Sequence, residues 1–401
     1  KYAINDVTAS ILAEEIAGAG YINGAVGITV QDAIGLADFA TISAARGAGI
    51  NIVLDGGISD TAANLAPAGA VDARLTNAVT QDPDVAITVT GVAPIVAEVN
   101  SIAGATTGAV TATLSVGDMA TLGGLSTGSG DAISVVVTDA SVDAGAVVAL
   151  AGKTSLNVDA TAVDEITGTV VDIVAAATTT PNLLLADDYT VDASNAGSVA
   201  HVNTIAAATT GIVTVTVSEG DMTTLASLAT EATDAITVVV TDARVVASEL
   251  IALDAKTSVT VNAGQVETLT GTVEELSAYR DAFNAKTISG KLAYAVVASD
   301  TTDDVADLIN LADPDVTNFD PDVYLPALTS MTGSASDVID FYNLTNVLQN
   351  EAGDALGDEA VTLTDTTLAA SVFNSVHTKT TGLIDASTVT TLTGAAADMN
   401  T

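Results

Sequence analysis

Short runs of β-branched residues recur along the chain, and each run ends in a polar turn residue. Within such runs, apolar and polar positions alternate, which predicts half-buried β-strands. Four of them begin at nearly equal intervals, near Tyr189 (YTVDA), Ile212 (IVTVTVS), Ile236 (ITVVVTDA) and Val259 (VTVNA). The regular spacing predicts a repeated unit of chain that adds one strand at a time.

Segments with helical spacing lie between the predicted strands. In VVASELIALDA, for example, Val246, Leu250 and Leu253 fall on one face of a helix. A strand followed by a helix in every such interval favours an α/β solenoid. We therefore expect parallel β-strands stacked in rungs of about 23 residues, with short helices along one flank.

A longer repeat is superimposed on the short one. Residues 95–174 and 198–277 align without a gap at a shift of 103, with about half the positions identical. A partial copy follows near the C-terminus, where DTTLAASVFNSVHTKT parallels DARVVASELIALDAKT. These similarities predict five segments, namely a degenerate unit over 1–85, full units over 86–188 and 189–290, an irregular aromatic and acidic unit over 291–355, and a partial unit over 356–401.

The composition excludes several classes of partner. The chain carries 50 acidic and 10 basic residues, a formal net charge of −40, so it lacks the basic patches that nucleic acid binding needs. At 48% hydrophobic residues it is too apolar for a disordered acidic tail. No run is long and apolar enough to predict a membrane span. Cysteine is absent, which rules out a disulfide framework.

Acidic residues recur at one place in the repeat. Asp139, Asp242 and Asp365 each stand at the end of a predicted strand, just before a helix. One interpretation is that each caps the helix that follows it. The other is that the carboxylates form a column bridged by Ca²⁺. Three further pairs, Thr169/Asp172, Thr272/Glu275 and Ser334/Asp337, have the spacing of a capping box.

A second calcium candidate is the loop ADPDVTNFDPD at 312–322. Asp313, Asp315, Asp320 and Asp322 offer hard oxygen ligands at close spacing on a segment stiffened by proline. Further carboxylates lie upstream, at Asp300, Asp303, Asp304 and Asp307. The glycine and terminal glutamate of an EF-hand are missing, so the expected site is of another type.

No catalytic constellation stands out. The two histidines, His201 and His377, have no nearby histidine or cysteine partner, and neither is repeated in the other copies. The scarce basic residues Lys153, Lys256 and Lys379 share one repeat position at the end of a short helix, where a cation complements the helix dipole. We therefore expect no enzyme.

Three other functions remain open. Seven of the twelve aromatic residues lie between Tyr279 and Tyr342, which is typical of a surface that binds a glycan or a protein. The TxT runs at 111–113 and 214–216 occur in some ice-binding solenoids, although few of the rungs carry them. A polysaccharide-cleaving solenoid would need basic residues beside its carboxylates, and these are scarce.

The units VTDxxVxAxxLxxLxxKT and VTTLTGxxADxN resemble the Ala/Thr/Val-rich repeats of very large bacterial surface proteins. These include adhesins, S-layer-like proteins and cyanobacterial surface proteins linked to swimming. The resemblance covers most of the chain. It implies a secreted, cell-surface protein with a structural or adhesive role, stabilised by Ca²⁺ and inclined to self-association, and it supplies no catalytic residues.

Overall fold

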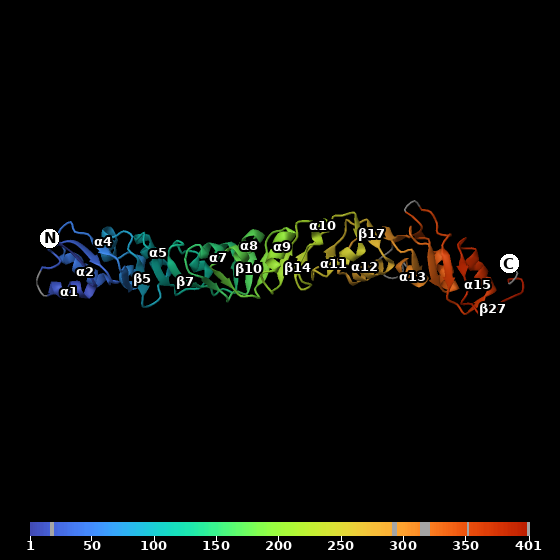
Figure 1. The fold of residues 1–401 in the computed structure, drawn as a ribbon, viewed down its shortest axis with the longest axis horizontal. Coiled ribbons are helices and arrows are strands. Elements are labelled where there is room, and N and C mark those ends of the chain that lie inside the picture. Colours follow the sequence, from blue (N-terminus) through green and yellow to red (C-terminus); the bar gives the residue numbers. More distant parts are fainter. Residues whose placement is uncertain (17–19, 291–294, 313–320, 351–352, 399–401) are drawn as a thin grey trace. The chain divides into compact units, whose positions relative to one another are not determined.

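The computed structural model describes residues 1–16, 20–290, 295–312, 321–350 and 353–398. The chain divides into two compact units, the first made of Lys1–Asn195 with Ala207–Gly211 and the second of Ala196–Ala206 with Ile212–Thr401. In each unit, short strands alternate with short helices along the sequence (Figure 1). This division is coarser than the five segments predicted from the sequence, whose boundaries stay a prediction.

The elements of the first unit are mostly three to ten residues long. They are β1 (Tyr2–Asp6), α1 (Thr8–Ile16), β2 (Ala25–Val30), α2 (Leu36–Ala45), β3 (Ile52–Leu54), β4 (Ile58–Thr61), α3 (Ala62–Leu65), η1 (Pro67–Gly69), α4 (Ala73–Gln81), β5 (Ile87–Thr90), α5 (Val96–Ala105), β6 (Val110–Thr113), α6 (Met119–Leu122), β7 (Ala132–Val136), β8 (Ser141–Asp143), α7 (Ala144–Ala151), β9 (Val158–Ala160), β10 (Glu165–Gly168), α8 (Val170–Val174), η2 (Ala175–Thr179), β11 (Leu183–Leu185) and β12 (Thr190–Ala193).

The second unit continues the alternation with similar elements. They are α9 (Val199–Ala206), β13 (Val213–Thr216), α10 (Met222–Leu225), β14 (Ala235–Thr237), β15 (Arg244–Val246), α11 (Ala247–Asp254), β16 (Val261–Asn262), β17 (Thr268–Gly271), α12 (Val273–Ala285), β18 (Ile288–Ser289), β19 (Ala295–Ala298), β20 (Thr302–Asp304), α13 (Val305–Ala312), β21 (Asp322–Tyr324), β22 (Ser330–Gly333), α14 (Ala335–Asn343), β23 (Val347–Leu348), β24 (Ala360–Leu363), β25 (Thr367–Ala369), α15 (Ala370–His377), β26 (Ile384–Asp385) and β27 (Thr391–Thr393).

Neighbouring strands pair in parallel, so the fold is α/β with several parallel sheets. In the first unit, β1, β2 and β3 form one sheet, and β4, β5, β6, β7, β9 and β11 form another in that order. In the second unit, β15, β17, β19, β21 and β23 form one sheet, and β20, β22, β24 and β26 form another. Where a sheet skips strand numbers, as from β15 to β23, the intervening strands belong to other sheets.

The register defines a regular advance along the chain. We call the chain length between two residues that pair on neighbouring parallel strands a step. Ser141 pairs with Glu165, which lies 24 residues later. Across a short step, the hydrogen-bonded residues Val110 and Asp131 are 21 residues apart. Across a long step, the bonded residues Ala335 and Asp365 are 30 residues apart. The spacing predicted from the sequence is thus close to the shorter steps.

The predicted strands are present, but each step holds more of them than expected. The strands that begin at Thr190, Val213, Ala235 and Val261 start within two residues of the four predicted positions. The expectation of one strand per step is wrong for much of the chain. A second, short strand such as β15 (Arg244–Val246) directly precedes the helix, and it pairs with β17 of the next step.

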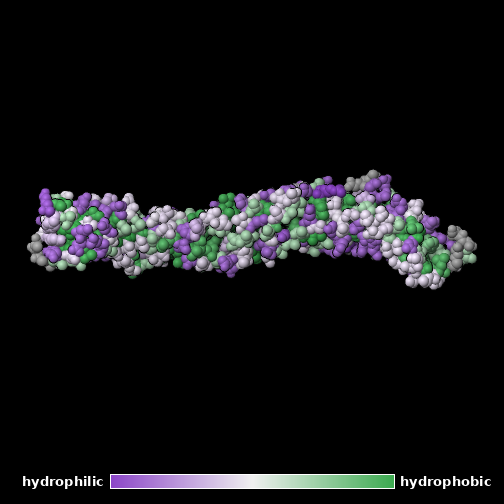
Figure 2. Space-filling view, viewed as in Figure 1, coloured by the Kyte–Doolittle hydropathy of each residue, from purple (hydrophilic) through white to green (hydrophobic). Residues whose placement is uncertain are grey.

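The core lies between the inner faces of the strands and the helices. On β6, Val110 and Ala112 are buried while Thr111 and Thr113 face outward, as period-two alternation requires. Each fully buried aliphatic side chain contributes about 1.5–3 kcal/mol to folding. On the face shown in Figure 2, hydrophobic and hydrophilic residues are interspersed over both units. Among exposed apolar residues, Val92 stands out at 88% exposure.

Candidate functional site

The repeated aspartates cap helices, but not the helices predicted from the sequence. Asp139 Oδ2 accepts a hydrogen bond from the Met119 amide at 2.7 Å, and Asp242 Oδ2 accepts one from the Met222 amide at 2.6 Å. Asp365 does the same for Ala335 at 2.7 Å. Each acceptor lies one step after the helix that it caps, not directly before its own helix. The parallel register brings the end of each strand beside the start of the previous helix.

This arrangement recurs in both units. We call it a cross-step cap, meaning a side chain that accepts a hydrogen bond from the first amide of the helix one step before it. Five more are present among the described residues, formed by Asp32 with Thr8, Asp60 with Leu36, Asn195 with Val170, Glu219 with Val199 and Asp300 with Val273. Their distances range from 2.6 to 3.2 Å. Seven of these eight caps are carboxylates and one is the amide of Asn195.

A second, local cap completes several of these helix starts. Asp118 accepts a hydrogen bond from the Thr121 amide and Asp221 from the Thr224 amide, both at 2.9 Å. The side chains of Thr169, Thr272 and Ser334 likewise accept from the third helical amide, but only Thr272/Glu275 completes the predicted capping box; Asp172 and Asp337 bond to the hydroxyl groups instead. Thr121 donates hydrogen bonds to Asp118, and Thr224 donates them to Asp221. These bonds lower the pKa of both aspartates below the ordinary value. The N-terminus of such a helix is thus capped by two side chains, one from its own step and one from the next step.

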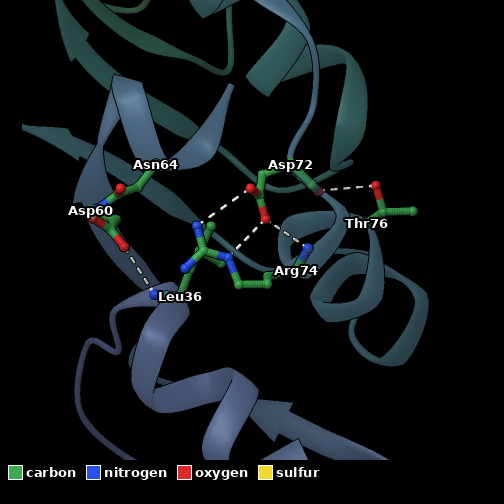
Figure 3. Close-up of polar contacts among 6 residues, drawn as sticks. All are labelled: Leu36, Asp60, Asn64, Asp72, Arg74 and Thr76. Atoms are coloured by element: carbon green, nitrogen blue, oxygen red, sulfur yellow. Dashed lines mark hydrogen bonds and ion pairs between the residues drawn. The ribbon is translucent and has the colours of Figure 1, made fainter. Parts of the chain in front are cut away.

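Asp60 illustrates the electrostatics of a cross-step cap (Figure 3). Its Oδ2 accepts from the Leu36 amide at 2.9 Å, and its Oδ1 accepts from Asn64 Nδ2 at 2.7 Å. Burial acts to raise the pKa of Asp60, but hydrogen bonds from Asn64, Leu36 and Thr61 together bring it below the ordinary value. The ionised carboxylate is therefore the form that this site stabilises.

An ion pair lies beside Asp60 in the same view (Figure 3). Arg74 Nε contacts Asp72 Oδ1 at 2.9 Å, and the Arg74 amide donates to the same oxygen at 2.8 Å. The side-chain hydrogen bond from Arg74 is the main cause of the lowered pKa of Asp72. Asp72 is the local cap of α4, so this rare arginine serves the helix start as well.

A set of threonines links successive steps in both units. Thr154 Oγ1 donates to the Ile133 carbonyl at 2.7 Å and accepts from the Ile133 amide at 2.9 Å. Thr257 makes the same two bonds with Ile236. Further members donate to a carbonyl one step earlier, at Thr106, Thr209 and Thr380. Both Thr154 and Thr257 are buried, so these hydroxyls replace a backbone bond inside the protein.

One buried carboxyl departs from this pattern and was not foreseen. Glu359 occupies the position that holds Ile133 and Ile236 in other steps, yet it is only 1% exposed. Its Oε2 accepts from Tyr342 Oη at 2.8 Å and from the Gly357 amide at 2.9 Å. Its Oε1 is buried without a partner. Burial and the bond to Glu359 raise the pKa of Tyr342.

The calcium candidates fall into two groups. Asp313, Asp315 and Asp320 lie outside the described residues, and Asp322 is the exposed first residue of β21. Asp139 and Asp242 are engaged as cross-step caps. Over the described ranges, no group of three or more acidic or imidazole side chains is placed to share a metal ion. Calcium binding by residues 312–322 stays a prediction.

Lysines of the repeated position also act across a step. Lys153 Nζ donates to the Leu125 carbonyl at 2.6 Å, in the preceding step. Lys379 Nζ donates to Asn343 Oδ1 at 2.7 Å, at the last residue of α14. The sequence predicted that each lysine complements its own helix, whereas these two reach an earlier segment. They support the link between neighbouring steps.

Part of the aromatic segment lies in the core. Tyr279 is fully buried and Phe341 is 1% exposed, while Tyr324 is half-buried in β21. Tyr294 and Phe319 lie outside the described residues. Two of the described aromatic side chains of this segment therefore pack inside the second unit rather than presenting a flat surface.

Comparisons with known proteins give no relative. No family model matches the chain, and neither a curated protein nor a solved structure is similar to it. Within the described part of the chain, none of the helices has the length and apolar character to cross a bilayer. A function must therefore be inferred from the geometry of the chain itself.

Proposed function

We propose that this chain is a structural segment of a secreted bacterial surface protein, built as an α/β solenoid, and not an enzyme. The carrying observation is the set of cross-step caps. Eight helix starts take a hydrogen bond from a side chain 20 to 30 residues later, as with Asp242 and Met222 or Asp365 and Ala335. These side chains join one step to the next and are therefore not free for catalysis.

The proposed role follows from what such joints do. In a solenoid, each segment contacts only its neighbours, so added segments lengthen the protein without changing its cross-section. That property suits a spacer, lattice or filament component. The net charge of −40 keeps copies apart unless cations screen it, which would place self-association under ionic control.

A register-preserving deletion tests the solenoid. Removing residues 95–197 takes out one full long repeat and joins Pro94 to Ser198, so the α9 segment replaces the α5 segment. We expect the shortened chain to keep its ellipticity per residue and a cooperative thermal transition. The control deletion, residues 95–185, breaks the register and should not fold. Equal loss of structure in both variants would refute the solenoid.

We also propose that Ca²⁺ bound at Asp313, Asp315, Asp320 and Asp322 stabilises the protein. Hard carboxylate oxygens on a short loop suit Ca²⁺, and binding to the folded state alone raises its stability. Chelation with EDTA should lower the melting temperature, and Ca²⁺ should restore it. The D313N/D315N variant should melt alike with and without EDTA. An unchanged melting temperature of the parent chain would remove calcium from the proposal.

A further inference from the structure

A polar cavity of about 600 Å³ lies between α12 and α13 in the second unit. Glu274, Ser277 and Arg280 line it from α12, and Asp307 and Asn310 line it from α13. Its volume falls in the range of pockets that hold small organic ligands. Most of its lining is polar, so a ligand with several hydrogen-bonding groups suits it better than an apolar one.

Arg280 supplies the first sign of a ligand. It is 6% exposed, and its guanidinium donates from Nη1 to the backbone carbonyl and Oδ1 of Asn310 and from Nη2 to Asp281. Its Nε is buried and has no partner. A buried donor without an acceptor is unfavourable, and an oxygen atom of a bound molecule that reached it would satisfy it.

The carboxylates of the cavity supply the second sign. Asp303 and Asp307 line the cavity together with Asp300, whose Oδ2 already caps Val273 at 2.7 Å. Glu274, Asp303 and Asp307 form no ion pair within the part of the chain that is described. Burial raises the pKa of Asp303, and the neighbouring carboxylates add to the rise. A cation placed here would relieve that repulsion.

The earlier copy of the repeat lacks these charges. At the shift of 103 between the two copies, Thr169 of α8 corresponds to Thr272 of α12, and both cap their helices in the same way. Where the later copy has Glu274, Arg280 and Asp281, the earlier copy has Val, Ala and Thr at 171, 177 and 178. The charged set is therefore particular to this cavity.

The ligand must carry both kinds of group. Asn310, which contacts Arg280, lies three residues after Asp307 on α13, so these two residues are less than one helical turn apart. A hexosamine or an ω-amino acid presents an ammonium group and an oxygen acceptor on one small molecule.

We propose that this cavity binds a small molecule with an ammonium group at one end and an oxygen acceptor at the other. The ammonium contacts Asp303, Asp307 and Glu274, and the oxygen lies toward Arg280. The inference concerns this cavity alone and does not depend on the structural role proposed above.

Calorimetric titration of the full chain tests the proposal with matched pairs of probes. Glucosamine is compared with glucose and N-acetylglucosamine, and 6-aminohexanoate with hexanoate. We expect at least one amine to bind ten-fold or more tightly than its partners without an ammonium group. Binding of glucosamine alone would identify an amino sugar as the source, and binding of 6-aminohexanoate alone an ω-amino acid.

Variants then locate the site. D307N keeps the size of the side chain and should weaken amine binding ten-fold or more, while E231Q, on an exposed loop of the same unit, should not. Alanine is a strong helix former, so α12 should form in R280A, which should also weaken binding. Binding of Ca²⁺ alone, binding of neutral probes as tight as that of the amines, or no binding by the folded parent chain would each overturn the proposal.

Discussion

Removal of one cross-step cap should loosen the helix one step before it. In D242A, the Met222 amide at the start of α10 loses its acceptor, which lies 2.6 Å away in the parent chain. A helix N-cap contributes about 0.5–2 kcal/mol. The bond here is short, half-buried and made by a carboxylate, which places it in the upper part of that range. We expect a loss of about 1–2 kcal/mol in the free energy of unfolding.

Two measurements separate this effect from a general loss of charge. Urea unfolding gives the global change, and hydrogen exchange of the Met222 amide reports the local one. In D242A that amide should exchange about 5–30-fold faster. The control E231A removes one exposed carboxylate of the same unit and should change neither quantity. D242N keeps an acceptor and should fall between the two.

The exchange rate of the Met222 amide decides whether Asp242 caps α10. If Met222 exchanged at the same rate in D242A and in the parent chain, Asp242 would not hold the start of α10. A loss confined to α11, the helix that follows Asp242 in sequence, would instead restore the sequence-based interpretation.

Three further predictions concern other polar groups. Y342F should lose about 1–3 kcal/mol in unfolding free energy, measured by urea denaturation, because the buried Glu359 Oε2 loses one of its two hydrogen-bond donors. T257V should lose about 1–3 kcal/mol, since the buried Ile236 amide is left without an acceptor, whereas T257S should retain most of it. The backbone hydrogen bond from Thr8 lowers the pKa of Asp32 below 3.8, so its stabilisation is complete above pH 3.8 and is lost as the pH falls through the folded-state value. The loss of stability below pH 3.8, followed by acid titration, should therefore be less steep in D32N than in the parent chain.

The strands and the longer helices could be predicted from local pattern alone. The runs near Ile212 and Ile236 alternate clearly, and α12 carries both a capping box and helical spacing. The short strands were missed because three residues such as Arg244–Val246 are too few to show a period, and they adjoin a helix without a turn residue. They become strands only because a neighbouring strand is available to pair with them.

The partners of the polar residues could not be predicted in the same way. Asp139 was expected to cap the helix that follows it, but it caps the preceding one, and this choice depends on the register between segments whose steps vary in length. Glu359 could have been found by aligning Thr380 with Thr154 and Thr257, because the residue 21 positions earlier is isoleucine in both other cases. No comparison of repeat positions indicates that Arg280 is buried.

The cross-step caps make the completion of each helix depend on residues that are synthesised later. A helix such as α6 cannot be finished when its own residues leave the ribosome, because its first amide waits for Asp139, which is synthesised 20 residues later. Each newly made portion therefore consolidates the one made before it and remains open at its own growing end. Any truncation product should accordingly fray at its C-terminal side, where the last helix lacks the residues that would have closed it.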